Sequence, residues 1–194
     1  MLSSPPALTL AQTFWPRPAH APTRAWTRDA VLVVAFSLLN ALCAQIAFPL
    51  PGTPVPVTGQ TFGVLLTGAL LGPRLGAAAL LLYLAEGACG LPVFAPTGAG
   101  LFTQGYLAAF PLAAALVGWL TARGWDRRPL TMLLAMALGS LVIYTCGAGW
   151  LAHFVGASHA LALGVLPYLP GDVLKSLLAA GLLPLGWKLL GAKR

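Results

Sequence analysis

The chain has 194 residues, of which 58% are hydrophobic and 8% are charged, and its mean hydropathy is +0.84. A soluble domain carries charge on roughly a quarter of its residues, so this composition excludes an ordinary soluble domain and indicates an integral membrane protein. A net charge of +7 would favour nucleic-acid binding in a soluble protein. Here membrane topology explains the basic residues better, and no nucleic-acid partner is expected.

The first 29 residues are rich in proline and alanine and include Trp15 and Trp26. They lack the basic start and directly following apolar core of a signal peptide. Because tryptophan side chains concentrate at membrane–water interfaces, residues 1–29 are predicted to form a cytoplasmic N-terminal tail that ends in an aromatic interfacial anchor.

Six apolar runs follow. They predict an all-α integral membrane protein with a six-helix transmembrane substrate-binding domain at 30–190 and a cytoplasmic C-terminus at 191–194. A span needs about 20 apolar residues, but the second run reaches only about 20 Å at about 1.5 Å per residue. The second and third runs are therefore predicted to be two short tilted spans, with a re-entrant hairpin as the alternative. The runs are 30–48, 60–72, 74–94, 105–122, 129–152 and 161–190.

The positions of the basic residues predict the orientation. With six spans, ten lysines and arginines lie on one side of the membrane, while the opposite loops at 49–59, 95–104 and 153–165 contain none. Cytoplasmic loops carry an excess of these residues, so both termini are predicted to be cytoplasmic; a re-entrant hairpin gives the same orientation. The ten residues are Arg17, Arg24, Arg28, Arg74, Arg123, Arg127, Arg128, Lys188, Lys193 and Arg194.

Asp172 and Lys175 stand three residues apart in the sixth run, just after the helix-start signal Pro170-Gly171. This spacing places both side chains on one face of the helix. An ionisable side chain within a membrane costs at least a few kcal/mol and generally marks a site, so the pair is predicted to bind a ligand. A structural ion pair and a proton relay are the alternatives. Glu86 lies at a comparable depth and is either a second site residue or an interfacial carboxylate.

Two outer loops are predicted to surround this site. Four prolines between Pro49 and Pro56 prevent a helix and stiffen the chain, so this loop is predicted to be a lid, or otherwise a rigid connector. After it come three neutral hydrogen-bonding residues, Thr58, Gln60 and Thr61. The second loop joins the third run to the fourth. At its two ends Phe94 and Tyr106 could stack on a flat ligand, and Thr103 and Gln104 lie beside Tyr106 in the sequence. Tyr83 is interpreted as a core or interfacial residue.

The sequence holds no motif for a nucleotide, a metal or a hydrolytic nucleophile. It contains no G-x-x-x-x-G-K-[ST] phosphate loop and no H-E-x-x-H or G-x-S-x-G motif. His153 and His159 are six residues apart, which is not a metal-ligand spacing on a helix, and the three cysteines form no C-x-x-C pair. No cofactor and no enzymatic activity are expected, and uphill transport would need a partner or a gradient.

Several stretches resemble the BioY family, the biotin-binding S components of energy-coupling factor (ECF) transporters. The resemblance implies six helices, an outward-facing pocket, and biotin held partly by Asp172 and Lys175, with Glu86 as a further polar pocket residue. It also implies a membrane coupling subunit and two cytoplasmic ATPases as partners in the cell membrane. The stretches are PVPVTGQTFGVLL at 54–66, GALLGPRLG at 68–76, LYLAEGACGLPVFA at 82–95 and LPGDVLK at 169–175.

The chemistry of biotin agrees with such a pocket. Asp172 can accept a ureido N–H, and Lys175 can donate to the ureido oxygen or to the carboxylate. Apolar walls are expected from Phe94, Tyr83 and Leu174. The predicted substrate-binding residues are Asp172, Lys175, Glu86, Tyr83, Phe94, Thr58, Gln60, Gln104 and Tyr106.

Two other classes of function remain open. One is a stand-alone proton-coupled small-molecule carrier in which Asp172 and Glu86 bind protons. The other is a membrane scaffold without a ligand.

Overall fold

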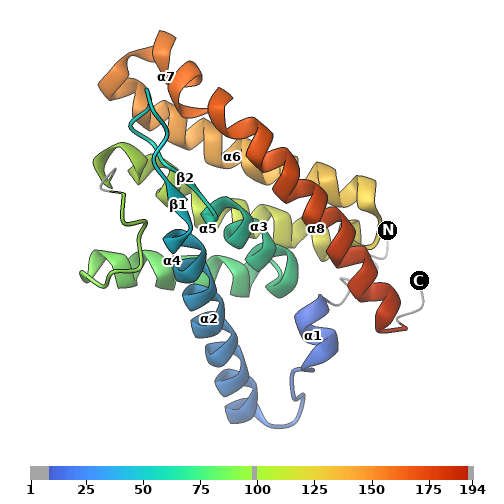
Figure 1. Ribbon diagram of the computed structural model, residues 1–194. Coiled ribbons are helices and arrows are strands. Elements are labelled where there is room, and N and C mark those ends of the chain that lie inside the picture. Colours follow the sequence, from blue (N-terminus) through green and yellow to red (C-terminus); the bar gives the residue numbers. More distant parts are fainter. Residues whose placement is uncertain (1–8, 98–99, 192–194) are drawn as a thin grey trace, which may run out of the picture.

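The computed structural model describes residues 9–97 and 100–191. Apart from one short β-hairpin, the regular structure in these residues is helical (Figure 1). The elements in chain order are α1 (Leu10–Phe14), α2 (Pro22–Gln45), β1 (Ala47–Phe48), β2 (Val57–Thr58), α3 (Gln60–Leu71), α4 (Pro73–Ala88), α5 (Gly100–Thr121), the 3-10 helix η1 (Trp125–Arg127), α6 (Pro129–Val155), α7 (Ala157–Gly164), the 3-10 helix η2 (Leu166–Tyr168) and α8 (Leu169–Leu189).

Four helical stretches in the described part of the chain are long and apolar enough to cross a membrane. They are α2, α5, α6 and the run from Ala157 to Leu189 that combines α7 with α8. The expected hairpin of the second and third runs consists of α3, with 12 residues, and α4, with 16 residues. At about 1.5 Å per residue α3 is only about 18 Å long, so the depth of this hairpin stays a prediction.

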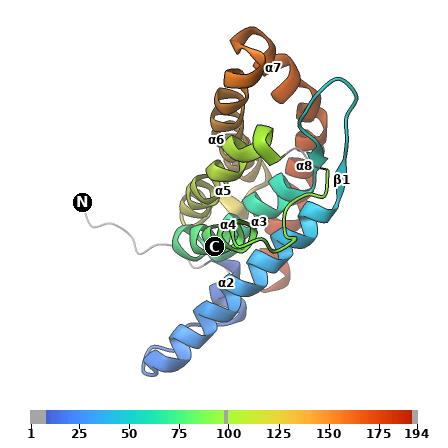
Figure 2. The same cartoon turned by 90° about the vertical axis from the view of Figure 1, so that its left-hand side faces the viewer.

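Helix α5 occupies the centre of the bundle and contacts α3, α4 and α6, while α2 packs on α3 and α4 and α8 packs on α6. Close helix contact depends on small residues: a Cβ at Gly68 would lie 2.3 Å from the backbone oxygen of Ala114 on α5. Such contacts stabilise helix pairs in a membrane, where lipid competes for apolar surface. Figures 1 and 2 show α7 and the loop between β1 and β2 together at one end of the molecule.

The N-terminal segment folds onto the bundle instead of leaving it. Helix α1 is closed by a capping box between Thr9 and Gln12, and Leu10 is 4% exposed. A Cβ at Gly186, near the end of α8, would lie 3.9 Å from Leu10. Helix α2 begins at Pro22, so the expected boundary between a tail and a helical domain at residue 29 falls inside this helix.

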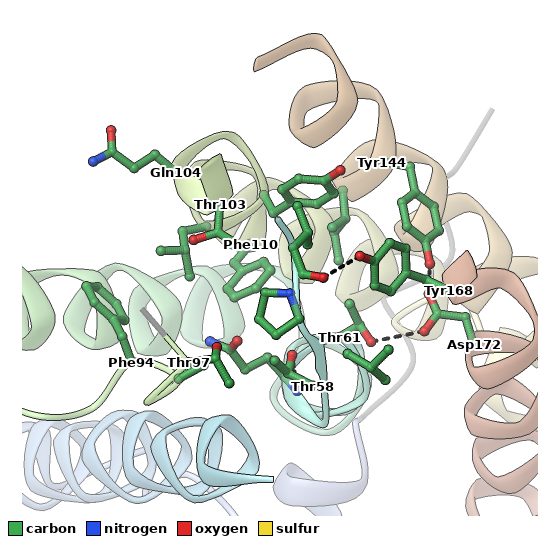
Figure 3. Close-up of a pocket in the computed structure, with 18 of the residues that line it drawn as sticks. Thr58, Thr61, Phe94, Thr97, Thr103, Gln104, Phe110, Tyr144, Tyr168 and Asp172 are labelled. Atoms are coloured by element: carbon green, nitrogen blue, oxygen red, sulfur yellow. Dashed lines mark hydrogen bonds between the residues drawn. The ribbon is translucent and has the colours of Figure 1, made fainter. Parts of the chain in front are cut away.

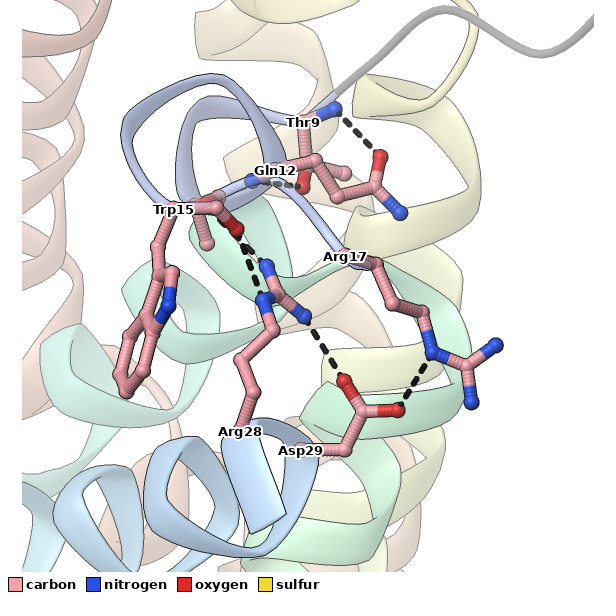
Figure 4. A network of polar contacts seen from close by, with 7 residues as sticks. Thr9, Gln12, Trp15, Arg17, Arg28 and Asp29 are labelled. Carbon is pink, nitrogen blue, oxygen red and sulfur yellow. Dashed lines mark hydrogen bonds and ion pairs between the residues drawn. The ribbon is translucent and has the colours of Figure 1, made fainter. Parts of the chain in front are cut away.

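Arg28 connects α1 to α2 (Figure 4). Its side chain is 2% exposed and donates to the backbone oxygens of Trp15, at 2.7 Å, and Ala11, at 3.2 Å. Asp29 accepts from Arg28 at 2.7 Å and from Arg17 at 2.9 Å. Carbonyls at a helix C-terminus lack intrahelical donors, and the buried guanidinium supplies one to Trp15, while the Ala11 oxygen also accepts from the Trp15 N–H.

The sixth apolar run is not one helix. It is interrupted by η2 between α7 and α8, and Pro167 lies inside this 3-10 turn. Pro170 then occupies the first turn of α8, where proline is tolerated because that N–H needs no intrahelical acceptor. The helix start that was predicted near Pro170 is confirmed, and the interruption before it places Tyr168 beside the start of α8.

A buried carboxylate, that of Asp126, joins η1 to the C-terminal end of α8. Asp126 is 1% exposed and accepts a hydrogen bond of 2.6 Å from the indole N–H of Trp187. The Arg127 guanidinium lies 4.5 Å from the centre of the Trp187 ring. Burial raises the pKa of Asp126 from its ordinary 3.8 to about 6, and the hydrogen bond from Trp187 opposes this rise.

Replacing Asp126 by asparagine removes this titration and keeps an oxygen for Trp187. Because the pKa is raised in the folded protein, the carboxyl group stabilises the fold fully below pH 3.8, and this contribution is lost as the pH rises through about 6. Between these limits we expect the wild type to lose free energy of unfolding relative to Asp126→Asn, on the order of 2 kcal/mol. Unfolding of both proteins in detergent across this range measures the difference, and parallel pH profiles would contradict the prediction.

Candidate functional site

A cavity of about 270 Å³ lies at the end of the bundle that carries the β-hairpin. The segments that enclose it are β2 with the residues around it, the loop after α4, the start of α5, the middle of α6, η2 and the start of α8. Figure 3 shows Asp172 and Tyr144 on one side of this group and Phe94 and Thr97 on the other. The lining residues are Val55, Pro56, Val57, Thr58, Gln60, Thr61, Phe94, Ala95, Thr97, Gly100, Thr103, Gln104, Tyr106, Leu107, Phe110, Ile143, Tyr144, Tyr168, Asp172 and Lys175.

Asp172 and Lys175 share one face of α8, as their spacing predicts, and both line the cavity. Lys175 Nζ lies 3.0 Å from Asp172 Oδ1, and the two side chains are 22% and 9% exposed. A buried ion pair alone contributes little stability, because desolvation offsets the attraction. Stability of the fold alone is therefore a weak explanation for this ion pair, and its place in the cavity wall agrees with a role in ligand binding.

The start of α3 completes the surroundings of Lys175. The Lys175 ammonium group also donates to the backbone oxygen of Thr58, at 2.9 Å, and to Thr61 Oγ1, at 2.7 Å. Thr61 in turn donates to Asp172 Oδ1 at 3.2 Å. An ammonium group has three N–H donors, and all three are used within the protein. The charge pair thus holds the first turn of α8 against the first turn of α3.

Tyr144, on α6, is the third partner of the pair, and the sequence reasoning did not identify it. Its hydroxyl donates to Asp172 Oδ2 at 2.6 Å, and the residue is 8% exposed (Figure 3). A hydrogen bond to an ionised acceptor is about twice as strong as a neutral one. The available signal was a tyrosine inside an apolar helix, whose hydroxyl needs a partner once buried.

Gln60 lines the cavity, and Tyr83 behind it fixes the orientation of its amide. Tyr83 is fully buried, and its hydroxyl donates to the backbone oxygen of Val93 at 3.1 Å. The same hydroxyl therefore accepts from Gln60 Nε2, at 2.6 Å. The amide nitrogen of Gln60 is thereby turned toward Tyr83, and its oxygen is the group left for other donors. Tyr83 does not line the cavity and acts through its neighbours.

Phe94 forms part of the opposite wall, as predicted. Its ring meets Tyr83 edge to face, with 5.4 Å between ring centres. The ring also lies directly on Gly87 of α4, where a Cβ would be 2.1 Å from it. Glycine at this position is what lets the aromatic ring lie against the helix.

Gln104 and Tyr106 lie in the first two turns of α5, and both line the cavity. Tyr106 is 8% exposed, its hydroxyl donates to the backbone oxygen of Gly164 at 2.8 Å, and its ring leaves no room for a Cβ at Gly147. Gln104 is exposed. Tyr106 therefore joins α5 to α6 and α7, while Gln104 lies at the rim.

The proline-rich loop covers one side of the cavity and is fastened to the segment before α8. Ala47 pairs with Thr58 and Phe48 with Val57 in the antiparallel hairpin, so the prolines did prevent a helix. Within the loop, Thr53 donates to the backbone oxygen of Leu163 at 2.7 Å. Tyr168 donates to the backbone oxygen of Val55, and its hydroxyl lies 3.1 Å from Thr53 Oγ1. These contacts form the latch, defined as Thr53 and Tyr168 with their two carbonyl partners.

Two predicted wall or site residues lie elsewhere. Glu86 accepts a hydrogen bond from the fully buried Ser37 of α2. Glu86 does not line the cavity. Leu174 is 61% exposed on the outer face of α8. In the described residues no three His, Cys, Asp or Glu side chains are grouped as metal ligands would be. Phe110, Ile143 and Tyr168 are lining residues that the sequence reasoning did not single out.

Comparison with known proteins agrees with this architecture. The model of the BioY family matches residues 14–192. A probable biotin transporter BioY from Pyrococcus horikoshii is 41% identical over 154 residues, which cover 77% of this chain and 90% of that protein. The biotin transporter BioY from Rhizobium etli is 35% identical over 184 residues, which cover 86% and 98%.

A solved structure has the same fold. The crystal structure of the S-component for biotin from an ECF-type ABC transporter matches with a TM-score of 0.72 at 22% identity, over 88% of this chain and 95% of that chain. Because the family model matches nearly the whole described chain and the two relatives match over most of their length, the chain belongs to the BioY family.

Proposed function

We propose that this protein captures biotin as the substrate-binding subunit of an ECF-type ABC transporter, and that it is not an enzyme. The observation that carries the proposal is a partly buried Asp172–Lys175 pair on the wall of a 270 Å³ cavity in a member of the BioY family. The Pyrococcus and Rhizobium relatives are named as biotin transporters. A cavity of this size suits a small vitamin, because ligand pockets are typically a few hundred Å³.

The polar wall fits the ureido ring of biotin. This ring has two N–H donors and one carbonyl acceptor, and the wall offers the carboxylate of Asp172 and the amide oxygen of Gln60 as acceptors. Phe94, Phe110 and Ile143 provide apolar surface for the bicycle. Thr58 and Gln104 extend the polar contacts toward the rim.

The proposed topology has six membrane helices, with the cavity open to the outside and both termini in the cytoplasm. The basic residues of η1 and of the α3–α4 turn support it, since the loops around the cavity contain no lysine or arginine. The contact of Asp126 with Trp187 also places η1 at the end of α8 that is far from Asp172. The proposed transmembrane domain at 30–190 has cytoplasmic ends, and the first helix of this domain begins before residue 30, at Pro22.

The proposed partners are a membrane coupling subunit and two cytoplasmic ATPases. The chain has no phosphate-loop motif, so energy for uptake has to come from elsewhere. The rival proton-coupled carrier needs Glu86 and Asp172 on one path, but Glu86 is bonded to Ser37 and lies off the cavity. Uptake by liposomes that contain this chain alone, abolished by collapse of the pH gradient, would favour the rival.

Mass spectrometry of small molecules released from the denatured, purified protein tests the proposed ligand directly. Biotin is expected among them. A different co-purifying molecule, together with no heat of binding on titration with biotin, would overturn the proposed function.

Substitution of the charge pair is expected to weaken biotin binding while the protein still inserts and folds. Asp172→Asn and Lys175→Ala each leave the other partner uncompensated, and we expect the dissociation constant to rise at least about tenfold, the equivalent of about one charged hydrogen bond. Isothermal titration of purified protein measures it. Val173→Ala, on the exposed face of the same turn, is the matched control. Wild-type affinity in both charge variants would refute these assignments.

Loosening the latch is expected to shorten the residence time of biotin. Tyr168→Phe removes the hydroxyl that bonds Val55 and Thr53, and one lost hydrogen bond corresponds to roughly a fivefold to tenfold faster dissociation. Release of radiolabelled biotin after dilution into unlabelled biotin gives the rate. Ser158→Ala, on the exposed surface of α7, serves as control. An unchanged rate would mean that the loop is a rigid connector.

A further inference from the structure

The carboxylate of Asp172 is almost fully committed to the protein. A carboxylate offers about four acceptor positions, two on each oxygen. Oδ1 receives Thr61 and Lys175, at 3.2 and 3.0 Å. Oδ2 receives Tyr144 at 2.6 Å. One acceptor position, on Oδ2, is left for a ligand.

Tyr144 decides where that position lies. Oδ1 is held from the side of α3 and α8, whereas the bond from Tyr144 comes from α6, on another wall of the same cavity. Anchored at both oxygens by different helices, the carboxylate cannot rotate without breaking a charge-assisted hydrogen bond. Without the hydroxyl, Oδ2 would have both of its positions open.

The other two tyrosines of the cavity wall have different partners. Tyr106 donates to the backbone oxygen of Gly164, and Tyr168 to that of Val55. Both join segments of the chain. Among the three lining tyrosines, Tyr144 donates to an ionisable side chain.

We propose that Tyr144 is a positioning residue for recognition of the ligand: it fills one acceptor position of Asp172 Oδ2, so that the carboxylate accepts a single N–H of the ligand in a fixed direction. This inference rests on the proposed function, because biotin is the ligand considered. It predicts that the two ureido N–H groups of biotin are not equivalent in the site.

Two biotin analogues, each methylated on a different ureido nitrogen, test this property. In the wild type the analogue that lacks the N–H accepted by Asp172 is expected to bind at least about tenfold more weakly than its isomer, the scale of one charged hydrogen bond. In Tyr144→Phe both acceptor positions of Asp172 Oδ2 are open and either N–H can be accepted, so this ratio should fall several-fold toward unity. A purely structural effect of the substitution would weaken both isomers equally and leave the ratio unchanged.

Titration of biotin and both analogues on wild type, Tyr144→Phe and Tyr106→Phe decides among the outcomes. Tyr106→Phe also removes a hydroxyl from the cavity wall and is expected to keep the wild-type ratio, whatever its effect on biotin affinity. Equal binding of the isomers by the wild type, or an unchanged ratio in Tyr144→Phe, overturns the inference alone. Failure of the wild type to bind biotin at all overturns the proposed function with it.

A second measurement applies if Tyr144→Phe does not fold. In a structure of the wild type with biotin, the Tyr144 hydroxyl should remain on Asp172 Oδ2, and one ureido nitrogen should lie within hydrogen-bond distance of the same oxygen. A Tyr144 hydroxyl that has left Asp172, or two ureido nitrogens on this carboxylate, would overturn the inference.

Discussion

The partly buried ion pair at the start of α8 is the constraint on which the rest of the site depends. Charges in apolar surroundings are tolerated when hydrogen bonds and opposite charges compensate them. Their partners come from the end of β2, from the first turn of α3 and from the middle of α6. The site can therefore form only when α3, α6 and α8 are packed, and distortion of that packing changes the recognition chemistry directly.

The same requirement explains the tyrosines around the cavity. Loops and helix breaks leave backbone carbonyls without donors, which is costly where water is scarce. Tyr83, Tyr106 and Tyr168 donate to carbonyls in three such places, the loop after α4, the end of α7 and the proline-rich loop. Each hydroxyl supplies a hydrogen-bond donor to a backbone carbonyl and thereby also holds a segment of the cavity wall in place. These hydrogen bonds tie the irregular segments around the cavity to the rest of the fold.

The sequence identified the charge pair because ionisable residues stand out in apolar sequence, and it predicted a non-helical loop at 49–56 because prolines exclude a helix. It could not identify Tyr144, since a tyrosine in the middle of an apolar helix shows that its hydroxyl needs a partner but not which neighbouring helix supplies it. Glu86 stood out for the same reason as Asp172, but α4 turns it toward Ser37 of α2, and depth along a helix does not reveal which neighbour a face meets. The hydropathy pattern did not show the break at η2, because hydropathy stays high across it, whereas Pro170 and Gly171 did predict the helix start that follows it.

The hydrogen bonds already made by Asp172 and Lys175 limit how a ligand can gain binding energy from them. Lys175 has all three N–H groups donated within the protein, so a ligand that bonds to it has to exchange a partner, and the net gain of an exchange is small. Asp172 has one position left, and the lining side chains of Phe94, Phe110 and Ile143 are apolar. Tight binding in such a cavity comes from apolar burial and from groups that are already fixed in place. Selectivity then depends on the few positions left open, and the direction in which Tyr144 holds the carboxylate matters more than the number of polar groups nearby.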